Sequence, residues 1–283
     1  GYNIFFTNLL GKNLNPKDLT GVFLGSLILL VVGLWDDAKN ISPRVRLFAT
    51  VIAVFVAVFG GVGIDKITNP FGGVISLQNF LVLADVLVFF WILGMTYTVK
   101  ILDGLDGLAT GITAIGALVI YGVAIGERWY QPDMALLALV FAGVCLGFLF
   151  WNFSPAKIFL GEGGGLFLGY ILGVLAVISG GKIATALLVM AIPILDLLRV
   201  VIVRLKRGQP IFQGDREHLH FWLRDHGFSE KKIVLGLYLT AIVFGSLTLF
   251  LQSIGKLLAL LFLFLLMGAL ALIIQNKKDY VQK

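Results

Sequence analysis

Two pairs of aspartates stand out because each adjoins a long apolar run. Asp36 and Asp37 are adjacent where one run ends, and Asp103 and Asp106 are three residues apart where another begins. Neighbouring carboxylates repel each other and favour a nearby cation, either a divalent metal or a basic side chain. The first pair alone is equally compatible with a solvated helix end. The second pair points one way on a helical turn and is costly at a membrane helix end, so it predicts a functional site.

The segment 152–165 carries a different set of groups: Asn152, Lys157, Phe159 and Glu162, followed by a run of three glycines. Glycine-rich helix starts hold phosphates through exposed backbone N–H groups. Lys157 would add a cation, and Phe159 a stacking face for a base, so we expect this segment to contact a substrate. Glycine is also common where membrane helices pack closely, and the segment by itself leaves both interpretations open.

The longest polar connection, 204–233, contains Asp215, Arg216, His218 and His220. Histidines two residues apart lie on one side of an extended chain, and with the neighbouring charges they form a cluster suited to phosphate or metal. Zinc is disfavoured because the third histidine is separate in sequence and the single cysteine lies inside an apolar run. We expect Arg216 and the two histidines to bind an anion.

Membrane helices must position these groups, because the composition is that of an integral membrane protein. Of 283 residues, 59% are hydrophobic and 13% are charged, against roughly 25% charged residues in a soluble domain. Crossing a bilayer takes roughly 20 helical residues, and many runs approach that length. We predict an all-α, polytopic membrane protein with about nine transmembrane helices. The predicted spans are 19–35, 46–63, 81–97, 107–126, 134–151, 165–180, 183–203, 234–252 and 256–274.

The predicted spans place all the candidate groups on one side of the membrane. That side carries most of the 22 Lys and Arg, so the positive-inside rule makes it cytoplasmic. We therefore expect a multi-pass protein of the inner (plasma) membrane with its site on the cytoplasmic face. No internal repeat or linker divides residues 1–283, which we treat as one domain. Because the sequence starts without methionine, we expect it to lack its natural N-terminus; the family resemblance described below implies that one or more N-terminal helices are missing.

Two classes of function are compatible with this arrangement. Acid pairs, a glycine-rich helix start and a basic histidine cluster at a membrane face are typical of metal-assisted phosphoryl chemistry on a lipid. The alternative is an ion-coupled transporter, whose ionisable residues lie nearer the bilayer midplane. Asp85, inside the third span, suits transport better, although we interpret it as structural. Asp196 and Arg199, one helical turn apart, are predicted to form a local ion pair that supports the cytoplasmic surface.

In order and over nearly the whole chain, the sequence resembles the polyprenyl-phosphate N-acetylhexosamine-1-phosphate transferases of glycosyltransferase family 4. Five segments carry the resemblance: Asp36-Asp37, DGLDGLA at 103–109, PAKIFLGEGG at 155–164, PILDLLR at 193–199 and PIFQGDREHLH at 210–220. The last two, together with 68–73, look more like the undecaprenyl-phosphate N-acetylglucosamine-1-phosphate transferase branch. That branch starts O-antigen (lipopolysaccharide), teichoic acid and related cell-wall glycans.

The resemblance implies a reaction and its partners. An N-acetylhexosamine 1-phosphate would pass from a UDP-sugar, here UDP-N-acetylglucosamine, to polyprenyl (undecaprenyl) phosphate with release of UMP, as the first membrane step of a cell-envelope glycan. It also implies Mg²⁺, with Mn²⁺ as an alternative, bound at Glu162. The partners would be the nucleotide sugar, the lipid, the membrane and, as is common among these enzymes, a second copy of the chain. We expect no nucleic-acid partner.

The resemblance also assigns roles by position. Asp36 and Asp37 would activate or position the lipid phosphate or help hold the metal, while Asp103 and Asp106 would contact the nucleotide. Phe159 would stack on uracil. Four residues of the last segment would grip the pyrophosphate and the sugar: Asp215, Arg216, His218 and His220.

Three positions depart from the family pattern. Glu162 stands where the family has a metal-binding aspartate, Lys100 where it usually has asparagine, and Phe221 where a third histidine commonly follows. The longer arm of Glu162 can misplace an octahedral magnesium ion. One hypothesis is that Lys100 pairs with Glu162 beside the substrate and partly replaces the metal, which leaves a slow or altered enzyme. The other is a catalytically impaired relative that still binds nucleotide or lipid.

Overall fold

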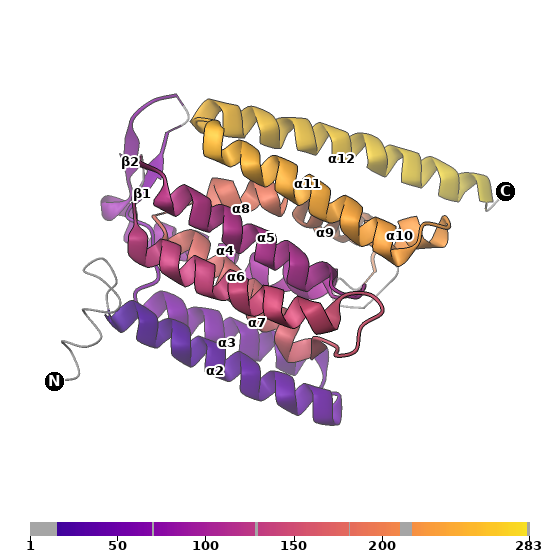
Figure 1. Cartoon of the computed structure of the whole chain (residues 1–283), viewed down its shortest axis with the longest axis horizontal. Helices are drawn as coiled ribbons and strands as arrows, with labels where there is room; N and C mark the ends of the chain where they lie inside the picture. The colour runs from indigo at the N-terminus through magenta and orange to yellow at the C-terminus, as the bar shows by residue number, and fades with distance from the viewer. Residues whose placement is uncertain (1–15, 70, 128–129, 181, 210–216, 282–283) are drawn as a thin grey trace.

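All nine predicted segments are helical in the computed structural model, which describes residues 16–69, 71–127, 130–180, 182–209 and 217–281, with side chains to residue 269. The helices lie side by side, with α2 and α3 on one flank and α11 and α12 on the other (Figure 1). The elements are α2 (Pro16–Lys39), α3 (Pro43–Phe59), β1 (Lys66–Thr68), β2 (Val74–Ser76), η1 (Gln78–Phe80), α4 (Leu81–Leu102), α5 (Leu108–Ile125), α6 (Pro132–Asn152), α7 (Gly161–Ile178), α8 (Ile183–Val189), α9 (Ala191–Lys206), α10 (Leu219–Asp225), α11 (Glu230–Phe250) and α12 (Ser253–Val281).

The described residues do not show all nine predicted membrane spans. Within the described residues, six helices are long and apolar enough to cross a membrane, and α8 with α9 would make a seventh as one broken span. The helix α3 has only 17 residues, which reach about 26 Å at 1.5 Å per residue. The side chains of α12 are described only over Ser253–Ala269, although the helix continues to Val281, so α12 is not counted among the six. The chain is a multi-pass membrane protein, but an apolar run in a sequence does not show where its helix ends.

The predicted span at 183–203 is two helices. They meet at Met190 with a bend of 79° between α8 and α9. The sequence carried a signal for this break that the span prediction did not use: Pro193, three residues after Met190, has no backbone N–H to donate, and its ring crowds the carbonyl of residue 189. The bend turns the segment that carries Asp196 toward α10.

A short β-hairpin departs from the all-α prediction. The strands β1 and β2 pair antiparallel, with Lys66 opposite Ser76. In the turn, the Asn69 N–H donates to the carbonyl of Gly73 at 3.1 Å, and Gly72 has a φ of 120°, which favours glycine. The hairpin lies at the end of the bundle opposite α10 (Figure 1).

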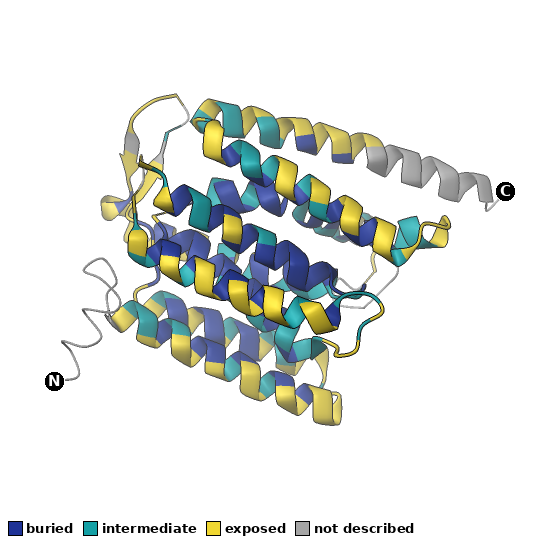
Figure 2. Ribbon diagram, viewed as in Figure 1, coloured by how far each residue is buried: buried dark blue, intermediate teal, exposed yellow. Residues whose placement is uncertain are grey.

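The centre of the bundle is formed by α5 and α7, which are buried over most of their length, whereas α2, α11 and the described part of α12 are largely exposed (Figure 2). The exposed residues there include Phe23, Leu239 and Phe262. Such an outward apolar face is expected where lipid replaces water. On α2 and α7, Gly33 and Gly163 let the two backbones touch, since a Cβ on Gly163 would lie 2.8 Å from the Cα of Gly33. This contact sets the end of α2, with its two aspartates, beside the start of α7.

Because the α2–α7 contact leaves no room for a methyl group, Gly33→Ala is expected to destabilise the protein by about 1–3 kcal/mol through overpacking. Thermal unfolding of the detergent-purified protein measures the effect. The matched control is Gly94→Ala in α4, where an added Cβ would meet nothing within 4 Å. Equal unfolding temperatures for the two variants would show that the two backbones do not approach this closely.

Candidate active site

Segments that are far apart in the sequence meet at the end of the bundle where α10 lies (Figure 1). The Glu162 N–H, in the first turn of α7, donates to Oδ1 of Asp37 at 3.0 Å. A Cβ on Gly104, between α4 and α5, would lie 2.7 Å from Nε2 of His220. A Cβ on Gly165 would lie 3.8 Å from Cβ of Asp103. The structure therefore brings the first acidic pair, the second acidic pair, the glycine-rich segment and α10 into one site.

A network of ion pairs occupies the middle of this site. The Lys100 Nζ lies 2.6 Å from Oε2 of Glu162, so the pairing that the sequence predicted is present. Arg46 contacts the same Glu162 oxygen at 2.8 Å and also contacts Oδ2 of Asp36 at 2.9 Å. Asp36 is buried, whereas the Glu162 side chain is 40% exposed. Two cations thus link an acid from α2 to an acid from α7.

Arg46 was missed as a site residue. It follows Arg44 at the start of α3, where both were counted only as charges that orient the helix. A useful signal was present: an arginine one turn inside an apolar membrane helix is expensive unless it has a partner, and Asp36 lies only ten residues away.

The second acidic pair is split between two environments. Oδ2 of Asp106 accepts a hydrogen bond from the Ala156 N–H at 2.9 Å, so this carboxylate anchors the glycine-rich segment. Burial, together with the negative charges of Glu162, Asp106 and Asp37, raises the pKa of Asp103 to about 7. Asp103 therefore lies where negative charge is crowded and an added positive charge would be stabilising.

Three residues of the glycine-rich segment were predicted to contact a substrate. Asn152 is buried, whereas Lys157 and Phe159 are exposed. The Asn152 side chain is buried, with Oδ1 accepting from the Thr110 hydroxyl at 2.9 Å and Nδ2 donating to the carbonyl of Ile158 at 3.0 Å. Its described contacts hold the loop. By contrast, Phe159 is 75% exposed, and the Lys157 ammonium lies over the Trp151 ring at 5.2 Å. An exposed ring beside a glycine-rich helix start is available for stacking on a base.

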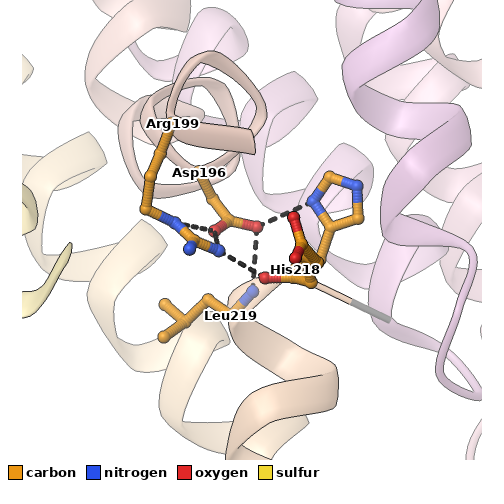
Figure 3. Close-up of polar contacts among 5 residues, drawn as sticks. Asp196, Arg199, His218 and Leu219 are labelled. Atoms are coloured by element: carbon orange, nitrogen blue, oxygen red, sulfur yellow. Dashed lines mark hydrogen bonds and ion pairs between the residues drawn. The ribbon is translucent and has the colours of Figure 1, made fainter. Parts of the chain in front are cut away.

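The predicted ion pair between Asp196 and Arg199 is confirmed, and it includes a histidine that the sequence did not link to it (Figure 3). Oδ1 of Asp196 accepts from Arg199 at 2.8 Å and 3.1 Å. Oδ2 lies 2.9 Å from Nδ1 of His218 and accepts from the Leu219 N–H at 3.0 Å. Arg199 also donates to the carbonyl of Glu217. This acid therefore fixes the start of α10.

In this cluster, His220 has a ring nitrogen without a hydrogen-bond partner among the described residues. The ring is buried, stacks nearly parallel to His218 at 5.8 Å, and its Nε2 has no hydrogen-bond partner among the described residues. Burial and the nearby charge of His218 lower the pKa of His220 to about 4, so the ring is neutral near pH 7. An unpartnered buried nitrogen facing the α4–α5 connection is a candidate substrate contact. Asp215 and Arg216 lie outside the described residues.

Comparison with known proteins decides the family. A profile described as Glycosyl transferase family 4 matches residues 19–180, more than half of the chain. The chain belongs to glycosyl transferase family 4. It is thus a member of an enzyme family that transfers sugar 1-phosphates, as the sequence motifs predicted.

Individual relatives agree with this assignment. The chain is 32% identical over 256 residues to a probable undecaprenyl-phosphate N-acetylglucosaminyl 1-phosphate transferase of Bacillus subtilis. This match covers 88% of the present chain and 70% of the Bacillus protein. It is 31% identical over 245 residues to a decaprenyl-phosphate N-acetylglucosaminephosphotransferase of Mycobacterium tuberculosis. This match covers 78% of the present chain and 60% of the mycobacterial protein. A phospho-N-acetylmuramoyl-pentapeptide-transferase of Desulforamulus reducens is 36% identical over 232 residues. This match covers 76% of the present chain and 67% of the Desulforamulus protein. The chain spans only three fifths of the mycobacterial relative.

Magnesium is typical of glycosyl transferase family 4, but the donors in this chain do not fit it as they are arranged. Oε2 of Glu162 is bound by the ammonium of Lys100 and the guanidinium of Arg46. Among the described residues, no three side chains of His, Cys, Asp or Glu are grouped to hold a metal ion. As arranged, the Glu162 carboxylate is paired with cations and is not a metal ligand.

Proposed function

We propose that this protein transfers N-acetylhexosamine 1-phosphate from a UDP-sugar to polyprenyl phosphate and releases UMP. A phosphate oxygen of the lipid would attack the phosphorus that bears the sugar, and the bond to the oxygen shared with UMP would break. UDP-N-acetylglucosamine and undecaprenyl phosphate are the substrates we favour. The names of the Bacillus and mycobacterial relatives support the sugar, while the Desulforamulus relative belongs to a different donor class.

The observation that carries this proposal is the meeting of Asp37, Asp103, Glu162 and His220 at one end of the bundle. Both proposed substrates carry phosphate groups, and the lipid must stay in the membrane, so a site at the helix ends suits both. In this assignment Phe159 stacks on uracil and Nε2 of His220 contacts the pyrophosphate or the sugar. His218 acts by positioning α10, because its Nδ1 is held by Asp196.

We further propose that Lys100 and Arg46 supply positive charge to this site. Phosphoryl transfer is accelerated mainly by positioning and by stabilising negative charge. The ammonium of Lys100 lies 2.6 Å from Glu162, in the region where Asp103 experiences crowded negative charge. It lowers the repulsion that an anionic nucleotide sugar would meet. A resident Mg²⁺ or Mn²⁺ would require Glu162 to leave these two partners.

Release of UMP tests the proposed function. Purified protein is incubated with UDP-N-acetylglucosamine and undecaprenyl phosphate, with magnesium or with EDTA, and UDP-N-acetylgalactosamine serves as the alternative donor. Lipid-dependent UMP release supports the transferase. Donor binding without release would favour the impaired relative, the second candidate, which the departures at Lys100 and Glu162 motivate. If the protein neither released UMP nor bound the donor, the transferase and the impaired relative would both be rejected, and the ion-coupled transporter would be the remaining hypothesis.

The localisation follows from the same proposal. A soluble nucleotide sugar is made in the cytoplasm, and the candidate site lies on the side that the distribution of Lys and Arg predicts to be cytoplasmic. We therefore assign the site to the cytoplasmic face of the inner membrane. Labelling of Phe159→Cys by a membrane-impermeant thiol reagent in intact cells and in inverted vesicles tests the assignment. The exposed side chain at position 159 should react only in inverted vesicles.

Phe159→Ala is expected to weaken UDP binding by about 1–3 kcal/mol, the usual contribution of an aromatic ring stacked on a base. Folding should be unchanged, because the ring is 75% exposed. Calorimetric titration with UDP measures the loss. The variant Phe159→Trp, which keeps an aromatic ring at this position, should bind UDP about as well as the native protein. The control is Phe71→Ala in the hairpin at the other end of the bundle, which is 84% exposed. A loss that is equal in both alanine variants would contradict the stacking role.

A further inference from the structure

The end of the bundle opposite the candidate active site contains a cavity that the proposed transferase reaction does not use. It has a volume of about 330 Å³ and is bordered by β1, the α7–α8 connection and the α11–α12 connection. These elements lie together at the hairpin end in Figure 1. The cavity is therefore separated from the candidate site by the length of the membrane helices.

Three lysines line this cavity: Lys66, Lys182 and Lys256. Lys182 is only 8% exposed. Its Nζ donates to Oε1 of Gln131 at 3.1 Å. The Nζ of Lys256 donates to the Thr185 hydroxyl at 3.1 Å. No Asp or Glu is among the described residues that line the cavity.

Two of these lysines, Lys182 and Lys256, repel each other. Burial, together with the positive charge of Lys256, lowers the pKa of Lys182 to about 8. Since like charges in a partly desolvated space repel, an anion that enters the cavity would stabilise both ammonium groups. The polar wall of the cavity thus selects for negative charge.

The other wall of the cavity is apolar and continues along the membrane helices. A second cavity of about 270 Å³ lies between α8, α9 and α12. The two cavities share Leu187, Leu257 and Leu260, and all residues that line the second one are apolar. A ligand that fills both spaces would carry an anionic head and a hydrocarbon chain.

We propose that this lysine cavity binds the phosphate headgroup of an anionic lipid from the leaflet opposite the candidate active site, with a hydrocarbon chain in the adjoining groove between α8–α9 and α12. Three ammonium groups match a phosphate, which accepts several charge-assisted hydrogen bonds. The continuous apolar groove distinguishes a lipid from free phosphate, because an inorganic anion would gain nothing from Leu257 and Leu260. This site is independent of the transferase assignment.

Native mass spectrometry of the detergent-purified full chain tests the proposal, with dioleoylphosphatidylglycerol and dioleoylphosphatidylcholine as probes of equal chain length. We expect the native protein to retain phosphatidylglycerol roughly tenfold better. The double variant Lys182→Gln, Lys256→Gln should lose this preference, and Lys66→Gln, Lys256→Gln should reduce it while keeping the buried Lys182. The control Lys231→Gln, Lys232→Gln changes two exposed lysines at the other end of α11.

A second arm separates a lipid from free phosphate. Leu257→Trp, which narrows the shared part of the groove, should weaken retention of phosphatidylglycerol, and inorganic phosphate should not compete at millimolar concentration. Equal retention of the two lipids would overturn the proposal, as would an unchanged preference in both cavity-lysine variants. Tight binding of inorganic phosphate with no effect of Leu257→Trp would instead assign the cavity to a free anion and reject the lipid.

Discussion

Replacing Asp196 with alanine is expected to lower the free energy of unfolding by about 3–5 kcal/mol, because it leaves a buried cationic partner uncompensated. The Asp196 and Arg199 side chains are 7% and 13% exposed, so solvent screens their interaction little. One carboxylate serves Arg199, His218 and the Leu219 N–H (Figure 3). Its loss would release the start of α10, and misplaced catalytic groups commonly cost about 100-fold in rate.

Thermal unfolding and UMP release measure the two effects of Asp196→Ala. Asp196→Asn should fall between the native protein and the alanine variant, because an amide oxygen can still accept from the Leu219 N–H but carries no charge for Arg199. The control Asp225→Asn removes an exposed carboxylate at the end of α10. If Asp196→Ala lost activity with an unchanged unfolding temperature, the acid would act on the substrate itself and the positioning role would be wrong.

The double variant Lys100→Asn, Glu162→Asp is expected to acquire magnesium-dependent binding of UDP-N-acetylglucosamine. In the native protein, the ammonium 2.6 Å from Glu162 compensates its charge. Without it, the crowded carboxylates around Asp103 need another cation, and the shorter aspartate arm suits an octahedral ion better. We expect EDTA to weaken donor binding at least about tenfold in the double variant, or about 1.4 kcal/mol, and to change it little in the native protein.

Donor binding by calorimetry, with magnesium and with EDTA, measures this change without relying on turnover. The single variant Lys100→Asn should bind the anionic donor more weakly than the native protein in EDTA, because it only removes positive charge. Lys66→Asn is the matched control, since its exposed side chain lies in the hairpin at the other end of the bundle. No gain in magnesium affinity or activity in the double variant would count against both the charge-replacement hypothesis and the impaired-relative hypothesis.

Much of the fold was predictable because it depends on patterns that are local in the sequence. Apolar runs near 20 residues identified the helices, and the alternation of their connections put the acidic pairs, Glu162 and the histidines at one end. The errors have specific physical causes. The break at Met190 was missed because the run was judged by its apolar length and the nearby Pro193 was not used, and the hairpin at 66–76 uses too few residues to show a strand pattern.

The motif order by itself determined the family, because five short segments must match in sequence and none depends on knowing the fold. It also indicated that Lys100 and Glu162 depart from the family pattern together. A departure in the motif cannot show what replaces the lost contact, since that depends on which side chains reach the same space.

Tertiary structure alone decided the partners of these groups. Arg46 bridges Asp36 and Glu162 across 116 positions of sequence between α3 and α7, Asp196 holds His218, and Lys66, Lys182 and Lys256 share one cavity. Ion pairs and cavities form between helices brought together by packing, and that packing rests on close contacts such as Gly33 with Gly163. Periodicity and composition describe each helix by itself, so they carry no information on which faces meet.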